Sequence, residues 1–141
     1  LVRWLGYRTI ADPLVWSLHL GFAWVPAGLL LLGLATVVSD IPQSAGIHAL
    51  TAGAMGSMTL AVMTRAILGH TGRALTAAKW TAAIFALVSV AALIRVLAAL
   101  AEGLPLQALT FSAAAWAVAF ALFVLRYGRM LVSADPNSGL A

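Results

Sequence analysis

The sequence predicts an all-α membrane protein, a bundle of four transmembrane helices. Of its 141 residues, 63% are hydrophobic and 9% are charged, whereas a soluble domain carries about a quarter charged residues. The mean hydropathy is +1.03. Four apolar runs each reach the roughly 20 residues that a helical crossing needs. This composition excludes an ordinary soluble enzyme, and so few charges exclude a nucleic-acid-binding surface.

The four runs form a single transmembrane bundle with short polar connectors. We expect the spans at about residues 13–38, 45–68, 76–101 and 106–131, followed by a loose tail at 133–141. Asp12 and Pro13 predict the start of the first span, since an acidic N-cap and a proline at the first helical position favour a helix start. Pro26 predicts a kink or local unwinding in that span, and Gly69 predicts the C-cap of the second.

The basic residues predict the orientation of the bundle. They flank the two chain ends and the middle connector, at Arg3, Arg8, Arg73, Lys79, Arg126 and Arg129. The other two connectors contain Asp40 and Glu102 and no basic residue. Because cytoplasmic loops carry an excess of Lys and Arg, we expect both chain ends in the cytoplasm. The sequence has no cysteine, which excludes disulfides and thiolate metal sites.

Polar residues inside the spans are the candidates for function, because an ionisable side chain at the bilayer centre costs about 2.5–3.5 kcal/mol. His19 lies about two turns into the first span, where it either hydrogen-bonds a neighbouring carbonyl or binds a ligand. Arg95 lies well inside the third span and needs a partner. That partner is either Glu102 in the next connector or a cofactor carboxylate near Arg95 and His48.

The second span carries the most unusual helical face, which is formed by Ser44, His48, Thr51, Met55, Met58 and Arg65. Imidazole and thioether groups are ligands for haem iron and copper. The alternative is a methionine-filled packing seam with a capping histidine. The span is also rich in small residues, including Ala52, Gly53 and Gly56, so either a helix or a flat cofactor could approach its backbone.

A single metal cannot bind all three histidines. By helix rise, His19 and His48 are separated by on the order of 20 Å along the membrane normal. Two sites, ligands from elsewhere in the protein, or one structural histidine are all consistent with this separation. His19, Met63, Arg65 and His70 are expected at similar depth and could share a site. His70 and Arg65 form either an anion-binding corner or an ordinary surface loop.

Two stretches of the sequence resemble a known family. They are residues 12–21, DPLVWSLHLG, and residues 48–73, HALTAGAMGSMTLAVMTRAILGHTGR. Both are similar to the most distinctive segments of the NnrS family, bacterial polytopic inner-membrane proteins associated with haem, copper and the response to nitric oxide. The chain begins at Leu1 and resembles the C-terminal portion of such a larger protein. The resemblance implies motif histidines at His19, His48 and His70, and motif arginines at Arg65 and Arg73.

On this resemblance, we interpret the chain as a haem- and copper-associated inner-membrane protein that contributes to nitric-oxide response or tolerance. The expected metal ligands are His48 first, then His19 and His70, with Met55 and Met58 as soft copper ligands. Arg65, Arg73 and Arg95 would stabilise negative charge on the bound group. The expected partners are the lipid bilayer, the remaining helices of the full-length protein, and nitric oxide as a small ligand.

Two other classes of protein remain open from the residues. A haem-bearing electron-transfer or quinone-reactive membrane subunit predicts two histidines at matching depth on facing helices. A cofactor-free transmembrane scaffold predicts that carbonyl or hydroxyl groups satisfy each histidine. The sequence also leaves open whether nitric oxide is turned over, sensed or buffered, and therefore whether the protein is an enzyme.

Overall fold

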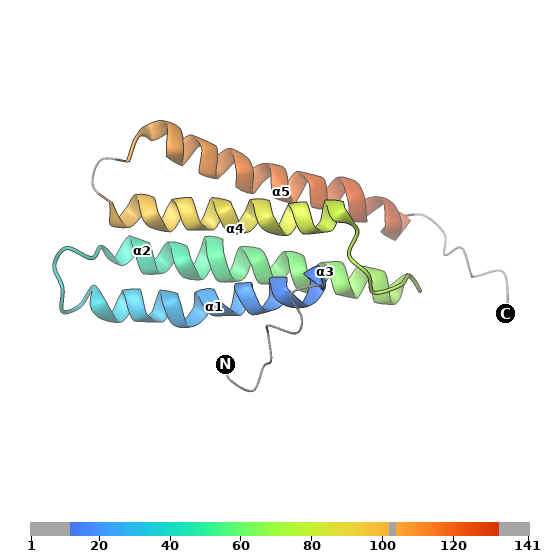
Figure 1. Ribbon diagram of the computed structural model, residues 1–141, viewed down its shortest axis with the longest axis horizontal. Coiled ribbons are helices and arrows are strands. Elements are labelled where there is room, and N and C mark those ends of the chain that lie inside the picture. The colour runs from blue at the N-terminus through green and yellow to red at the C-terminus, as the bar shows by residue number, and fades with distance from the viewer. Residues whose placement is uncertain (1–11, 102–103, 133–141) are drawn as a thin grey trace, which may run out of the picture.

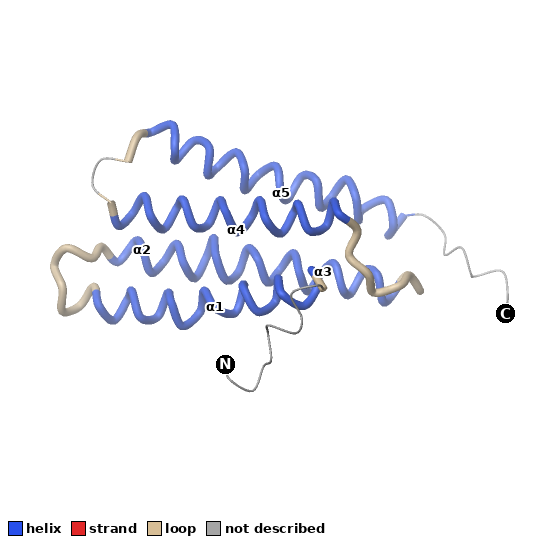
Figure 2. Tube along the Cα trace, in the orientation of Figure 1, coloured by secondary structure: helices blue, strands red, loops and turns tan. Residues whose placement is uncertain are grey.

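The computed structural model describes residues 12–101 and 104–132, which fold into a bundle of helices lying side by side (Figure 1). The helices are α1 (Pro13–Leu34), α2 (Gln43–His48), η3 (Ala49–Met55), α3 (Gly56–His70), α4 (Lys79–Leu100) and α5 (Leu106–Val132). The elements α2, η3 and α3 follow one another without a break and form the second span, Gln43–His70. Each of the four spans is long and apolar enough to cross a membrane. The predicted all-α bundle of four spans is therefore confirmed, and Figure 2 shows helices and loops alone in the described part.

The helix ends differ from the expected ones by a few residues. The first span ends at Leu34 rather than near residue 38, and the third span, α4, begins at Lys79 rather than near residue 76. Asp12 caps α1 as expected, because its carboxylate accepts a hydrogen bond from the Leu14 N–H at 2.9 Å. We expected a kink or local unwinding at Pro26, and the unwinding is absent because the helix runs through this residue without interruption. The tail at 133–141 lies outside the described residues.

The second span ends in a capping motif whose glycine lies three residues after the glycine that the sequence predicts. Gly69, the expected C-cap, lies inside α3. The glycine with a positive φ, 65°, is Gly72. Its N–H donates to the Gly69 carbonyl at 3.3 Å, and the Arg73 N–H donates to the Leu68 carbonyl at 2.9 Å. This pair of bonds is a Schellman motif, which requires the left-handed conformation that glycine adopts at no steric cost.

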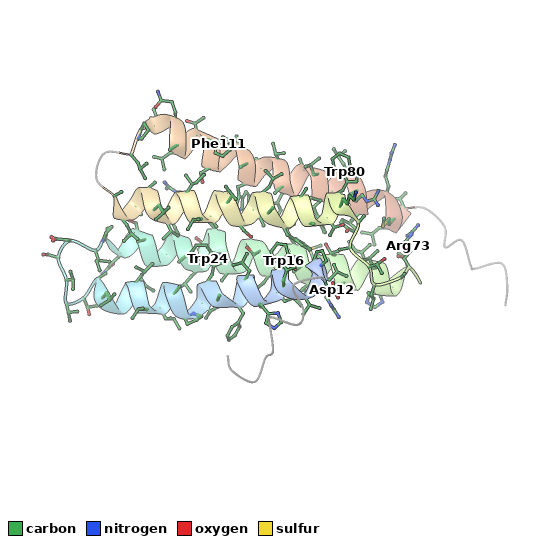
Figure 3. All side chains as sticks on the ribbon, viewed as in Figure 1. Asp12, Trp16, Trp24, Arg73, Trp80 and Phe111 are labelled. Atoms are coloured by element: carbon green, nitrogen blue, oxygen red, sulfur yellow. The ribbon has the colours of Figure 1, made fainter. Side chains whose placement is uncertain are left out.

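The first helix packs closely against the second span because both carry small residues at the contact. A Cβ added to Gly46 would lie 2.9 Å from the Gly28 carbonyl oxygen, and one added to Gly53 would lie 2.6 Å from the Trp24 ring. Trp24 extends from α1 towards the second span in Figure 3. Gly21 meets Met58 in the same way. On this side, the small residues therefore serve helix packing.

The apolar core lies in the half of the bundle nearest the connector at 71–78. It includes Leu60 of α3, Phe85 of α4 and Phe123 of α5. A hydrogen bond of 2.6 Å between the Thr81 and Tyr127 hydroxyls joins α4 to α5 inside it. In the opposite half the buried apolar residues are mostly small, among them Ala45 of α2, Ala49 of η3 and Ala92 of α4.

Candidate functional site

A cavity of about 780 Å³, open to the surface of the bundle, lies between the second span, α4 and α5. This volume is in the range of small-molecule and cofactor sites, about 300–1,000 Å³. The lining residues are His48, Thr51 and Ala52 of the second span, Ala91 and Arg95 of α4, and Leu109, Thr110, Ser112, Ala113 and Trp116 of α5. Two of the residues singled out in the sequence, His48 and Arg95, therefore line one cavity inside the spans.

The hydroxyl groups of the cavity wall are already committed to backbone carbonyls. Thr51 donates to Ile47 at 2.8 Å, Thr110 donates to Leu106 at 3.0 Å, and Ser112 donates to Ala91 at 2.7 Å. Because these donors are occupied, the wall offers a ligand two strongly polar groups, the imidazole and the guanidinium. Apart from these hydroxyls and the indole N–H of Trp116, the rest of the wall is apolar.

His48 and Arg95 are both half-buried. None of the residues in 12–101 and 104–132 forms a hydrogen bond with the His48 ring or an ion pair with Arg95. Glu102, the acidic partner considered for Arg95, lies outside the described residues. The cavity thus presents a nitrogen donor and a fixed positive charge in apolar surroundings, where electrostatic interactions are stronger than in water.

A π-helix sets the direction of the residues around His48. The element η3 begins at Ala49, immediately after His48, and ends at Met55. Short π-helical turns within α-helices are rare and occur frequently at functional sites. Each wider turn delays the rotation of the helix, so residues after η3 point away from the face that a 3.6-residue period predicts.

The predicted face of Ser44, His48, Thr51, Met55, Met58 and Arg65 is found only in part, because Thr51 lines the cavity with His48 whereas the two methionines do not. His48 faces the cavity towards α4 and α5, whereas Met58 packs on Gly21 of α1. Met55 is 66% exposed and does not line the cavity. The two methionines are not placed to join His48 on a single copper ion.

His19 lies away from this cavity and is bonded within its own helix. Its Nδ1 is 2.9 Å from the Val15 carbonyl oxygen. Since a carbonyl only accepts, this ring nitrogen carries the proton. Gly21 faces Met58 across the antiparallel pair, so His19 lies level with about residue 60, ~18 Å along the bundle from His48.

The remaining candidates gather at the opposite end of the second span. His70 is exposed at the last residue of α3, and Arg65 is half-buried about one turn before it. Arg73 follows the Schellman motif and lines a different cavity together with Arg126 and Arg129. By helix rise, His70 is ~33 Å from His48. Among the described residues, no three His, Cys, Asp or Glu side chains come close enough to hold one metal ion.

Trp116 is the lining residue that the sequence reasoning missed. Its ring stacks on Phe120 with centroids 4.1 Å apart, and its indole nitrogen approaches Gly56 of the second span. A tryptophan usually marks a membrane interface. Its place in the middle of a 27-residue helix is the signal that could have identified it.

These features define a multi-pass helical membrane protein with an imidazole and a guanidinium in one cavity within its spans. The family model described as "NnrS protein" matches residues 1–134. The chain therefore belongs to the NnrS family. No curated protein matches the chain, and no solved structure does.

Proposed function

We propose that this chain contributes to the nitric-oxide response by holding a haem in the cavity between His48 and Arg95. Membership of the NnrS family supports the nitric-oxide role. The single observation that carries the haem assignment is that His48 and Arg95 line the same cavity of about 780 Å³. A haem bound there would supply an iron centre able to take a small diatomic ligand.

The donor set fits a haem in three respects. Iron in haem takes an axial imidazole, and the His48 ring has no hydrogen-bond partner among the described residues. A guanidinium matches a propionate carboxylate in a bidentate geometry, and Arg95 has no carboxylate partner in that part of the chain. The small side chains of Ala52, Ala91 and Ala113 leave space for a flat ring.

Copper fits the described residues less well. A copper site needs several nitrogen or sulfur donors around one ion, and the cavity offers the imidazole of His48 alone. Met55 and Met58 point elsewhere. We therefore propose copper only as a metal whose other ligands come from outside residues 12–132.

The two other classes of protein are less favoured by the positions of the histidines. A subunit with a bis-histidine haem needs a second imidazole at the depth of His48, and His19 is ~18 Å away along the bundle. A cofactor-free scaffold explains His19, which is bonded to Val15. It does not explain His48 beside Arg95 in a cavity.

We further propose that the protein lies in the bacterial inner membrane with both ends in the cytoplasm. The start of α1, the connector at 71–78 and the end of α5 lie towards one end of the bundle (Figure 1), so the described residues Arg73, Lys79, Arg126 and Arg129 are gathered on one side. The cavity then lies nearer the opposite side, and nitric oxide, a small and weakly polar molecule, reaches it through lipid. A reporter fused after Ala141 tests this orientation, and a periplasmic reporter would contradict it.

Titration of the purified chain with haem in detergent micelles tests the proposed cofactor. We expect a Soret band that saturates at one haem per chain and shifts when nitric oxide is added. Free haem in the same micelles is the control for partition into detergent. Spectra that match free haem at every ratio would overturn the proposal.

A further inference from the structure

Three arginines converge at the end of the bundle opposite His48. Arg126 and Arg129 are three residues apart on α5 and therefore share one face of that helix. Arg73 comes from the connector after α3. The three side chains line a cavity of about 640 Å³ together with Met130 and Val132. Figure 3 shows Arg73 near this end of the bundle, with Trp80 beside α5.

No described carboxylate neutralises this cluster. The carboxylates in residues 12–101 and 104–132 are Asp12, which caps α1, and Asp40, which bonds Ser39 in the connector after α1. Neither forms an ion pair with an arginine. The Nη1 atom of Arg73 is buried and has no hydrogen-bond partner in the described part of the chain. Arg126 and Arg129 are exposed, so the cluster has donors available for an anion.

An apolar groove continues from the same arginines along the outside of the bundle. It has a volume of about 290 Å³ and runs between α4 and α5, where it is lined by Trp80, Ile84, Leu122, Leu125, Arg126 and Arg129. Trp80 is 69% exposed and Leu125 is 67% exposed. Because these apolar side chains face outwards on membrane-spanning helices, the groove opens to the lipid.

We propose that this arginine cluster and groove bind an anionic phospholipid. The phosphate lies among Arg73, Arg126 and Arg129, and one acyl chain lies along Trp80 and Leu125. Guanidinium groups bind phosphate oxygens in charge-assisted pairs, and basic pockets between transmembrane helices are known to take anionic headgroups. The groove favours a lipid over a free phosphate ion, since only a lipid fills its apolar part. The proposal does not depend on haem binding at the other end of the bundle.

Native mass spectrometry of the full chain in detergent tests this site with phosphatidylglycerol and phosphatidylcholine of identical acyl chains. We expect tighter binding of phosphatidylglycerol, and a loss of about fivefold in its affinity for each arginine removed. Arg126→Gln and Arg73→Gln are the test variants, and Arg126→Lys, which keeps the charge, should retain most of the affinity. Equal affinity for the two lipids would overturn the proposal.

Three further comparisons separate a specific lipid site from general electrostatic attraction. Lys79→Gln removes a charge at the same end of the bundle, but Lys79 lines neither the arginine-lined cavity nor the apolar groove. We expect it to change the affinity by less than about twofold, because exposed charges are screened by salt. A loss equal to that of Arg126→Gln would contradict a specific site. Trp80→Ala should weaken the binding of both lipids, because it removes part of the apolar groove. If inorganic phosphate competes fully with the lipid, the site binds soluble anions instead.

Discussion

His48 of the second span and Arg95 of α4 line one cavity. Neither side chain has a charged partner among the described residues. Placing both groups within a membrane-spanning bundle costs free energy that packing alone does not recover. The pairing of a nitrogen donor with a cation is what the proposed haem, a ligand with both a metal and carboxylates, would require.

Replacing Arg95 tests its proposed role towards that carboxylate. A hydrogen bond to a charged group contributes about 1.5–3 kcal/mol, so Arg95→Gln should weaken haem binding by about 10- to 100-fold. The measurement is a haem titration followed by absorption. Lys79→Gln, at the far end of the bundle, is the control for net charge. Haem affinity in Arg95→Gln equal to that of the wild type would remove Arg95 from the site.

The role of the cavity can also be tested by filling it with a larger side chain while its polar groups are left unchanged. Ala113 is exposed and lines the cavity, so Ala113→Leu places a larger side chain in it with little strain in the fold. We expect haem binding to fall while thermal stability stays near that of the wild type. Ala117→Leu is the matched control, one turn further along α5 and outside the cavity wall. An equal effect of both variants would argue against haem in this cavity.

The close approach of α1 and α2 predicts a strong effect of a single methyl group. In Gly46→Ala the new Cβ meets the Gly28 carbonyl oxygen at 2.9 Å, and backbone cannot move aside as a side chain can. Overpacking of this kind costs about 1–3 kcal/mol, which unfolding in mixed micelles can measure. Gly33→Ala has no atom within 4 Å of its new Cβ, and it should unfold at the wild-type denaturant concentration or a higher one.

The Schellman motif after α3 gives a matched pair of glycine variants. Gly72 has a φ of 65°, so Gly72→Ala should cost about 1–2 kcal/mol of unfolding free energy. Gly69 is helical and its added Cβ would meet nothing within 4 Å. Gly69→Ala should therefore stabilise the chain slightly. The reverse order of stabilities would show that the helix ends at Gly69.

Those two glycines illustrate how far the sequence predicts the fold. Composition and the length of the apolar runs suffice to predict four spans, since a membrane requires its crossing helices to be long and apolar. Local chemistry also predicts the Asp12 cap. The choice between Gly69 and Gly72 depends on two backbone hydrogen bonds that span several residues, and residue type alone does not decide between them.

The site was less predictable because of one irregular turn. A regular helical period puts His48 and Met55 on one face, but the wider turns of η3 change their relative direction, and Met55 does not line the cavity. No residue type in Ala49–Met55 specifies a π-helix. Depth within the membrane could place His48 near Arg95, and its mid-helix position could single out Trp116. Which helices Trp116 contacts depends on how α5 packs, and no local pattern contains that information.

Rescue of a cavity variant by free imidazole tests the central claim most directly. In His48→Gly the proposed iron ligand is removed and a space of its shape is left. We predict that this variant loses the Soret band of the bound haem and regains it when imidazole is added, while His70→Gly keeps the band throughout. A His48→Gly spectrum identical to that of the wild type without imidazole would contradict the account.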